Sequence, residues 1–255
     1  DSEALTKILR GEDIYELSYV YYQGGDYTKA IDGFKQLSGK EDSLSQHAMY
    51  LLGDSYLKTA QKANARNAFL FSAANNSNPT QREISRFNYA KLSYELGYQD
   101  EALKNLRSFI NDYPNSQYAE EATDLLVGAL ANTNNYREAM TMLESLRNPS
   151  TRTRQLYPRI LYGRATEMIN DGQLAEADAL LDKALRDQNN ASVLPLIHFW
   201  KGELAYRANN LDAAIQHYNA YLNGGAPVSG EATPANARYN LGYVYYRKEN
   251  YGVAQ

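Results

Sequence analysis

The sequence contains no cysteine, which excludes disulfides, thiolate catalysis and cysteine-ligated zinc, and leaves the redox compartment open. It also lacks long hydrophobic runs. The longest apolar stretch, LLVGALA from Leu125 to Ala131, is far shorter than a membrane-spanning helix. We therefore expect a chain with no direct membrane span.

Motifs for metal binding, phosphate binding and catalysis are also scarce. The three histidines, His47, His198 and His217, are not spaced as metal ligands on one helix face, and no glycine-rich phosphate loop is present. The segment GDS at Gly53–Ser55 falls inside an expected helix, where no strand-to-helix turn would expose a nucleophilic serine. The net charge of −4 argues against a protein that binds nucleic acid. We expect no enzyme activity, no cofactor and no metal site.

The abundant residue is tyrosine, with 23 copies against 6 phenylalanines and 1 tryptophan. Several of these tyrosines occur in a sequence motif that appears twice. The first copy is ELSYVYYQGGDYTKA, ending at Ala30, and the second is NLGYVYYRKENYGVA, ending at Ala254. Between these ends, alanines recur in similar surroundings, at steps from 35 residues (Ala30 to Ala65) to 40 (Ala214 to Ala254). The anchor alanines are Ala30, Ala65, Ala102, Ala139, Ala177, Ala214 and Ala254. A fixed period of this size indicates an internal repeat.

Each repeat reads as two helices separated by a turn. A small residue precedes most anchors by twelve positions, and a bulky residue follows most of them by four, as in Gly53, Ala65 and Phe69. The small residues allow two helices to approach closely, and the bulky residue fills the space beyond the crossing. Helix starts are expected at Pro158 and Pro195, and at Thr233 followed by Pro234.

These residues resemble the tetratricopeptide repeat: a small residue, a Gly-Asp-Tyr turn, an alanine, a bulky residue, and an exit such as NDYPNS at 111–116. The resemblance covers about residues 12 to 255. It implies an all-α fold, a right-handed α-solenoid of stacked antiparallel helix pairs, in which the first helices line a concave surface. We expect one array, with units at about 12–45, 46–82, 83–119, 120–157, 158–194 and 195–233, and a partial unit at 234–255.

The sequence departs from the family pattern in places. Its period exceeds the usual length of about 34 residues, Lys62 and Gln99 replace the turn tyrosine, and Arg164 and Lys201 occupy a column that is usually apolar. The opening SEALTKIL reads as the remainder of a preceding helix, and the chain stops after one helix of its seventh unit. We expect it to be a fragment of a longer protein.

A second stripe on the first helices is rich in aromatic residues. In the family this stripe would face the groove, and tyrosine suits a binding surface because it combines a large contact area with few rotatable bonds. The predicted groove residues are Tyr15, Tyr19, Tyr22, Tyr50, Phe87, Tyr94, Tyr162, Phe199, Tyr206, Tyr239, Tyr243 and Tyr246. The alternative is that these rings pack between successive first helices.

Between Glu144 and Glu167 the sequence carries five arginines and no acidic residue. These are Arg147, Arg152, Arg154, Arg159 and Arg164. One interpretation is a solvated loop whose arginines pair with neighbouring carboxylates. The other is a docking patch for an acidic partner segment.

We predict a non-enzymatic scaffold that binds a protein or peptide in the tyrosine-lined groove. Two alternatives stay open, a structural component of a bacterial envelope assembly and a regulatory arm of a larger signalling protein. The run FINDYPNSQYAEEA at 109–122 is similar to segments of periplasmic and outer-membrane-lipoprotein tetratricopeptide proteins that serve barrel-protein assembly or the Tol-Pal system. This similarity favours a periplasmic or cell-envelope location over the cytoplasm. The sequence names neither the partner nor the oligomeric state.

Overall fold

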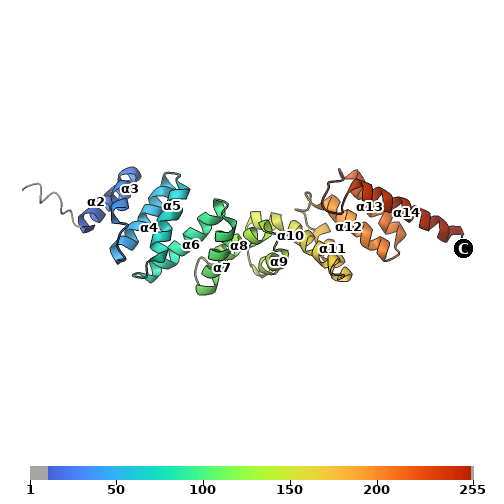
Figure 1. The fold of residues 1–255 in the computed structure, drawn as a ribbon, viewed down its shortest axis with the longest axis horizontal. Coiled ribbons are helices and arrows are strands. Elements are labelled where there is room, and N and C mark those ends of the chain that lie inside the picture. The colour runs from blue at the N-terminus through green and yellow to red at the C-terminus, as the bar shows by residue number, and fades with distance from the viewer. Residues whose placement is uncertain (1–10, 254–255) are drawn as a thin grey trace, which may run out of the picture. The chain divides into compact units, whose positions relative to one another are not determined.

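The computed structural model describes residues 11–253, and the regular elements in this range are helices joined by short turns (Figure 1). The segment SEALTKIL and the last anchor, Ala254, lie outside the described residues. The helices are α2 (Gly11–Gln23), α3 (Tyr27–Phe34), η1 (Lys35–Leu37), α4 (Ser43–Lys58), α5 (Lys62–Ala74), α6 (Pro79–Glu95), α7 (Gln99–Asp112), α8 (Ala119–Asn132), α9 (Tyr136–Ser145), α10 (Thr151–Asn170), α11 (Leu174–Leu185), α12 (Leu194–Arg207), α13 (Leu211–Asn223) and α14 (Pro234–Val253). The prediction of an all-α fold built from stacked helix pairs is confirmed.

The chain forms two compact units, one up to Ala129 and the other from Leu130, so that the division falls within α8. In the first unit each helix from α2 to α7 packs against the next one. In the second unit the same holds from α9 to α14. Each unit is therefore a stack of neighbouring helices, as a repeat protein requires.

The same turn joins the two helices of every described pair. The residue five positions before the anchor has a positive φ, and it is glycine in three pairs and asparagine in two; Ala60, with φ 57°, is the exception. The next amide donates a hydrogen bond back to the first helix, for example from Asp26 N to Tyr21 O at 2.9 Å and from Asn210 N to Ala205 O at 2.8 Å. This is the Schellman arrangement, which ends a helix and satisfies its last carbonyls.

The anchor alanines lie in the core as predicted. All those in the described range have no exposed surface, and the bulky residues four positions later are also buried. The small residues on the first helices leave room for an aromatic ring from the second helix. A Cβ on Gly53 would lie 2.7 Å from the Phe69 ring, and one on Gly202 would lie 3.1 Å from the Tyr218 ring. The close helix crossing inferred from the sequence is therefore present.

Helix starts are only partly as predicted. Pro195 lies in the first turn of α12, and Thr233 caps α14 by accepting a hydrogen bond from Asn236 N at 3.1 Å. Pro158, however, is buried inside α10, which begins at Thr151 after the cap residue Ser150. The prediction of a helix start at Pro158 was wrong, and the division of the array into seven units stays a proposal.

The cations in the usually apolar column have acidic partners. Lys201 on α12 bonds two carboxylates of α11, Asp178 at 2.8 Å and Asp182 at 2.6 Å. Arg164 pairs with Glu167 on its own helix at 3.1 Å. The column accepts charge in these two pairs because a carboxylate lies within reach of each cation.

Candidate protein-binding surfaces

Three tyrosines form a ladder along α2. Tyr15 and Tyr19 stack with ring centroids 5.9 Å apart, and Tyr19 and Tyr22 stack at 6.3 Å. Their spacing of four and three residues places them on one helix face. All three side chains are half-buried, so each ring keeps part of its surface open to solvent. We call Tyr15, Tyr19 and Tyr22 the N-terminal tyrosine ladder.

The ladder is fixed by the next first helix, α4. Tyr22 donates a hydrogen bond to Asp54 at 2.5 Å, and burial together with this carboxylate raises the pKa of the Tyr22 hydroxyl. Tyr15 meets the edge of His47 at 5.8 Å, and His47 in turn meets Tyr50 at 6.3 Å. The rings are therefore held in place before any partner arrives, which lowers the entropic cost of binding.

A similar group occupies α12 and α14. Tyr206 lies 6.1 Å from Tyr243, and Tyr243 stacks on Tyr246 at 6.2 Å. Arg247 lies over the Tyr206 ring at 5.2 Å. Tyr243 is 47% exposed and Tyr246 is 59% exposed, so this group is more open than the ladder on α2. We call Tyr206, Tyr243 and Tyr246 the C-terminal tyrosine cluster.

The same contact recurs between the first helices of consecutive helix pairs. The last tyrosine of one first helix contacts a residue near the middle of the first helix in the next pair. The contacted residues are Asp54 for Tyr22, Tyr243 for Tyr206, and Gly128 for Tyr94. At Gly128 any side chain would collide with the Tyr94 hydroxyl. Packing between successive first helices, the alternative raised above, thus explains how these rings are positioned, while their partial exposure leaves them accessible.

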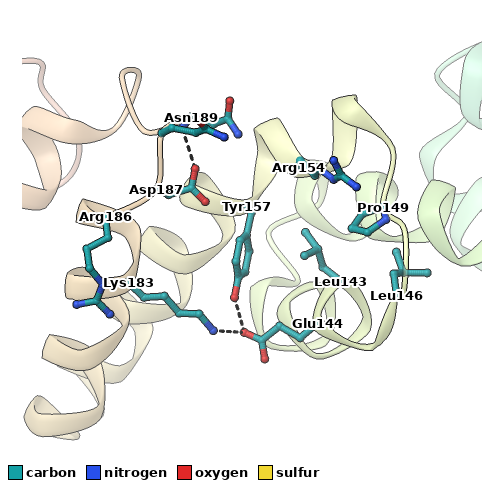
Figure 2. Close-up of a pocket in the computed structure, with 11 residues that line it drawn as sticks. Leu143, Glu144, Leu146, Pro149, Arg154, Tyr157, Lys183, Arg186, Asp187 and Asn189 are labelled. Atoms are coloured by element: carbon teal, nitrogen blue, oxygen red, sulfur yellow. Dashed lines mark hydrogen bonds and ion pairs between the residues drawn. The ribbon is translucent and has the colours of Figure 1, made fainter.

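A separate cleft of about 820 Å³ lies among α9, α10, α11 and the loops that follow α9 and α11. Figure 2 shows Tyr157 standing between its two walls. We call it the basic cleft, because three cations line it against two carboxylates. Its lining residues are Leu143, Glu144, Leu146, Pro149, Arg154, Tyr157, Lys183, Arg186, Asp187, Gln188 and Asn189.

Glu144 organises the centre of the basic cleft. It accepts hydrogen bonds from the Tyr157 hydroxyl at 2.7 Å and from Lys183 Nζ at 3.1 Å (Figure 2). Lys183 also lies over the Tyr157 ring, 5.4 Å from its centroid. Burial raises the pKa of Tyr157, and the hydrogen bond to Tyr157 raises the pKa of Lys183. Glu144 and Lys183 therefore largely neutralise each other.

The sequence model of the YfiO family, described as outer membrane lipoprotein, matches residues 11–143, just over half of the chain. The chain belongs to the YfiO family. A tetratricopeptide-repeat model matches residues 162–232 of this YfiO-family protein, and the predicted resemblance to the tetratricopeptide repeat is confirmed. No curated protein matches its sequence.

Several solved structures are similar to this YfiO-family chain. A tetratricopeptide repeat protein from Parabacteroides merdae is 15% identical with a TM-score of 0.49, covering 92% of this chain and 98% of its own. YrrB, described as a TPR protein with an unusual peptide-binding site, is 14% identical with a TM-score of 0.46, covering 82% and 97%. The TPR domain of P58(IPK) is 15% identical with a TM-score of 0.40, covering 98% and 68%.

Two predicted groove residues of the YfiO-family chain lie in the core instead. Phe87 is 4% exposed and stacks on Tyr118 at 4.8 Å, and Phe199 is 2% exposed and meets Tyr221 at 5.3 Å. Both lack a hydroxyl and pack against the second helix of their own pair, Phe87 against Phe109 at 5.6 Å and Phe199 against Tyr221. Their assignment to the groove was wrong. Tyr162, in the same column, is only half-buried, and its hydroxyl accepts a hydrogen bond from Trp200 Nε1 at 3.1 Å.

The predicted arginine patch is also smaller than expected. Arg159 donates to the carbonyl of Ala131 at 3.0 Å, and Arg164 is engaged by Glu167, so both serve the interior of the protein. Arg147, Arg152 and Arg154 remain exposed, and Arg154 lines the basic cleft.

Sequence reasoning missed the other two cations of the cleft. Lys183 and Arg186 come from α11 and the residue that caps it, about one repeat further along the chain. Aligning the second helices of neighbouring repeats would have suggested the pair, because Glu144 and Lys183 are 39 residues apart, close to the period.

The described residues hold no group of three or more His, Cys, Asp or Glu side chains that could bind a metal ion. Among the helices of the described range, none combines the length and the apolar character needed to cross a membrane.

Proposed function

We propose that this YfiO-family protein is a non-enzymatic scaffold that binds a peptide or a partner helix over the tyrosine rings of its first helices. The tetratricopeptide fold supports a role in protein–protein interaction. The finer assignment is supported by the N-terminal tyrosine ladder and the C-terminal tyrosine cluster, whose rings are held by neighbouring helices and remain partly exposed.

The observation that carries the proposal is the stacking of tyrosines along one face of α2. Three aligned rings offer a continuous apolar surface edged by hydroxyls, and binding energy at protein interfaces is concentrated on such aromatic anchors. Because the rings are already packed, a partner loses little affinity to ordering them. A helical partner would present apolar residues with matching spacing.

We further propose that the protein works at the cell envelope, as a component of an assembly complex. This is supported by membership of a family described as outer membrane lipoprotein. It agrees with the resemblance of residues 109–122 to envelope repeat proteins.

The test replaces three half-buried or exposed rings of the two tyrosine groups in one variant, with Tyr19→Ala, Tyr206→Ala and Tyr243→Ala. We expect this variant to keep its helical content by circular dichroism. After crosslinking in cells that make the full-length protein, it should lose partners that the unmodified protein retains, measured by quantitative mass spectrometry. Each ring removed should weaken binding by about 1 to 2 kcal/mol or more.

A control variant uses three tyrosines outside the predicted groove stripe, with Tyr21→Ala, Tyr98→Ala and Tyr245→Ala. On α14 the match is close, since Tyr243 is 47% exposed and Tyr245 is 46% exposed. The control should retain the partners. If both variants lose the same partners, or neither does, the tyrosine surface is not the binding site.

A further inference from the structure

The basic cleft contains positive charge that the protein does not use internally. Within residues 11–253, the side chain of Arg186 makes no hydrogen bond or ion pair, and Arg154 bonds only the Asn148 side-chain oxygen, at 2.9 Å. The third cation of the cleft, Lys183, is already paired with Glu144. The charge available to a ligand is therefore that of arginines, which bind carboxylates through two parallel hydrogen bonds.

The arrangement of these charges indicates the shape of the ligand. Arg154 and Arg186 lie on either side of Tyr157 (Figure 2). A ligand with acidic groups at two separate points, joined by a section that crosses the tyrosine ring, contacts both arginines. A single small anion contacts one of them.

The rest of the lining indicates a peptide. Leu143, Leu146 and Pro149 give the cleft an apolar wall, and Gln188 and Asn189 supply side-chain amides that bond peptide groups. The volume of about 820 Å³ falls within the range of roughly 300 to 1,000 Å³ that is usual for ligand sites.

We propose that the basic cleft binds an acidic peptide segment of a partner protein, with carboxylates on Arg154 and Arg186 and an apolar side chain between them on Leu143, Leu146 and Tyr157. Arg147, exposed beside the cleft, adds long-range attraction that speeds the approach of an acidic partner. This site is separate from the tyrosine surface and does not depend on it.

The experiment measures binding of a blocked peptide, DELEDLD, to the full chain by isothermal titration calorimetry. Two comparison peptides separate the contributions: NQLQNLN removes the charge, and DESEDSD removes the apolar side chains. We expect DELEDLD to bind most tightly and to weaken as the salt concentration rises. The double variant Arg154→Ala with Arg186→Ala should bind it at least about tenfold more weakly.

The control variant, Arg137→Ala with Arg238→Ala, removes the same charge from exposed positions outside the cleft lining. It should bind DELEDLD nearly as well as the unmodified protein. Both variants change exposed side chains, so their melting temperatures should match. The proposal is overturned if NQLQNLN or DESEDSD binds as tightly as DELEDLD, if both variants lose affinity equally, or if DELEDLD does not bind.

Discussion

The phrase YVYY occurs once in each compact unit, on α2 and on α14, and the two copies bury different residues. Val20 on α2 is 62% exposed, whereas Val244, the same position on α14, is fully buried. The small residue directly before YVYY has the opposite burial in the two copies. Ser18 on α2 is buried, while Gly242 on α14 is exposed.

Within the described residues, the two helices pack against different neighbours. α14 packs against α13, which precedes it, and α2 packs against α3, which follows it. On α14 the valine is buried in the cluster that holds Ala214 and Tyr218 of α13, and Leu92 and Leu204, at the same position in other pairs, are buried as well. The small residue faces the following helix. In a repeat protein the neighbours of a helix, more than its own sequence, decide which of its faces is buried.

The largest effect should come from placing a charge at the two valines. Val244→Asp puts a carboxylate into the cluster that holds Ala214 and Tyr218, and should lower the free energy of unfolding by about 3 kcal/mol or more. Val20→Asp should change it by about 0.5 kcal/mol at most. Urea unfolding followed by circular dichroism measures both. Equal losses would break the comparison, because they would show that Val20 is buried in solution.

The next largest effect concerns two glycines in the column of small residues, and its sign should differ between them. Gly53→Ala pushes a Cβ into the Phe69 ring and should destabilise by about 1 to 3 kcal/mol. Gly242→Ala meets no atom within 4 Å and should stabilise by about 1 kcal/mol, since alanine favours helices. Melting temperatures of the two variants should therefore move in opposite directions. A stabilising Gly53→Ala would contradict the close crossing of α4 and α5.

The repeat architecture was predictable because its signals are local. Small and bulky residues at fixed offsets, with Gly or Asn in the turn, define each helix pair without knowledge of its neighbours. The start of α10 was not predicted correctly because two start signals compete there. Pro158 suggested a first turn, but the helix begins after Ser150, whose hydroxyl accepts a hydrogen bond from Thr153 N at 3.2 Å.

The binding surfaces were harder to predict because they depend on contacts between repeats. Phe87 and Phe199 share a column with Tyr15 and Tyr50, and only the missing hydroxyl distinguishes the buried members. The basic cleft combines Arg154 with Lys183 and Arg186 from the next second helix and the residue that caps it. Single-sequence reasoning found the run of arginines but not the cations that complete the cleft.

The third and smallest predicted difference between the two regions concerns the pH dependence of stability, through their histidines. His47 packs between tyrosine rings, whereas His198 on α12 and His217 on α13 face each other with their Nδ1 atoms 3.0 Å apart. One nitrogen donates and the other accepts, so the contact is lost when both rings are protonated. Burial lowers the pKa of both, and at His217 the charges of His198 and nearby Lys201 lower it further, against Asp178 and Asp182, which raise it.

A lowered pKa means that the folded state binds fewer protons than the unfolded state, so acid should destabilise the protein. The loss should begin as the pH falls past about 6.5, the unfolded-state value, and be complete below the folded-state pKa. We expect the free energy of unfolding to fall between pH 7.5 and 5.5, with a smaller fall in His217→Gln, which keeps a hydrogen-bonding side chain. His47, whose pKa burial also lowers, contributes equally to both proteins and cancels in the comparison. Equal pH dependence in the two proteins would show that the facing pair on α12 and α13 adds nothing to the acid response.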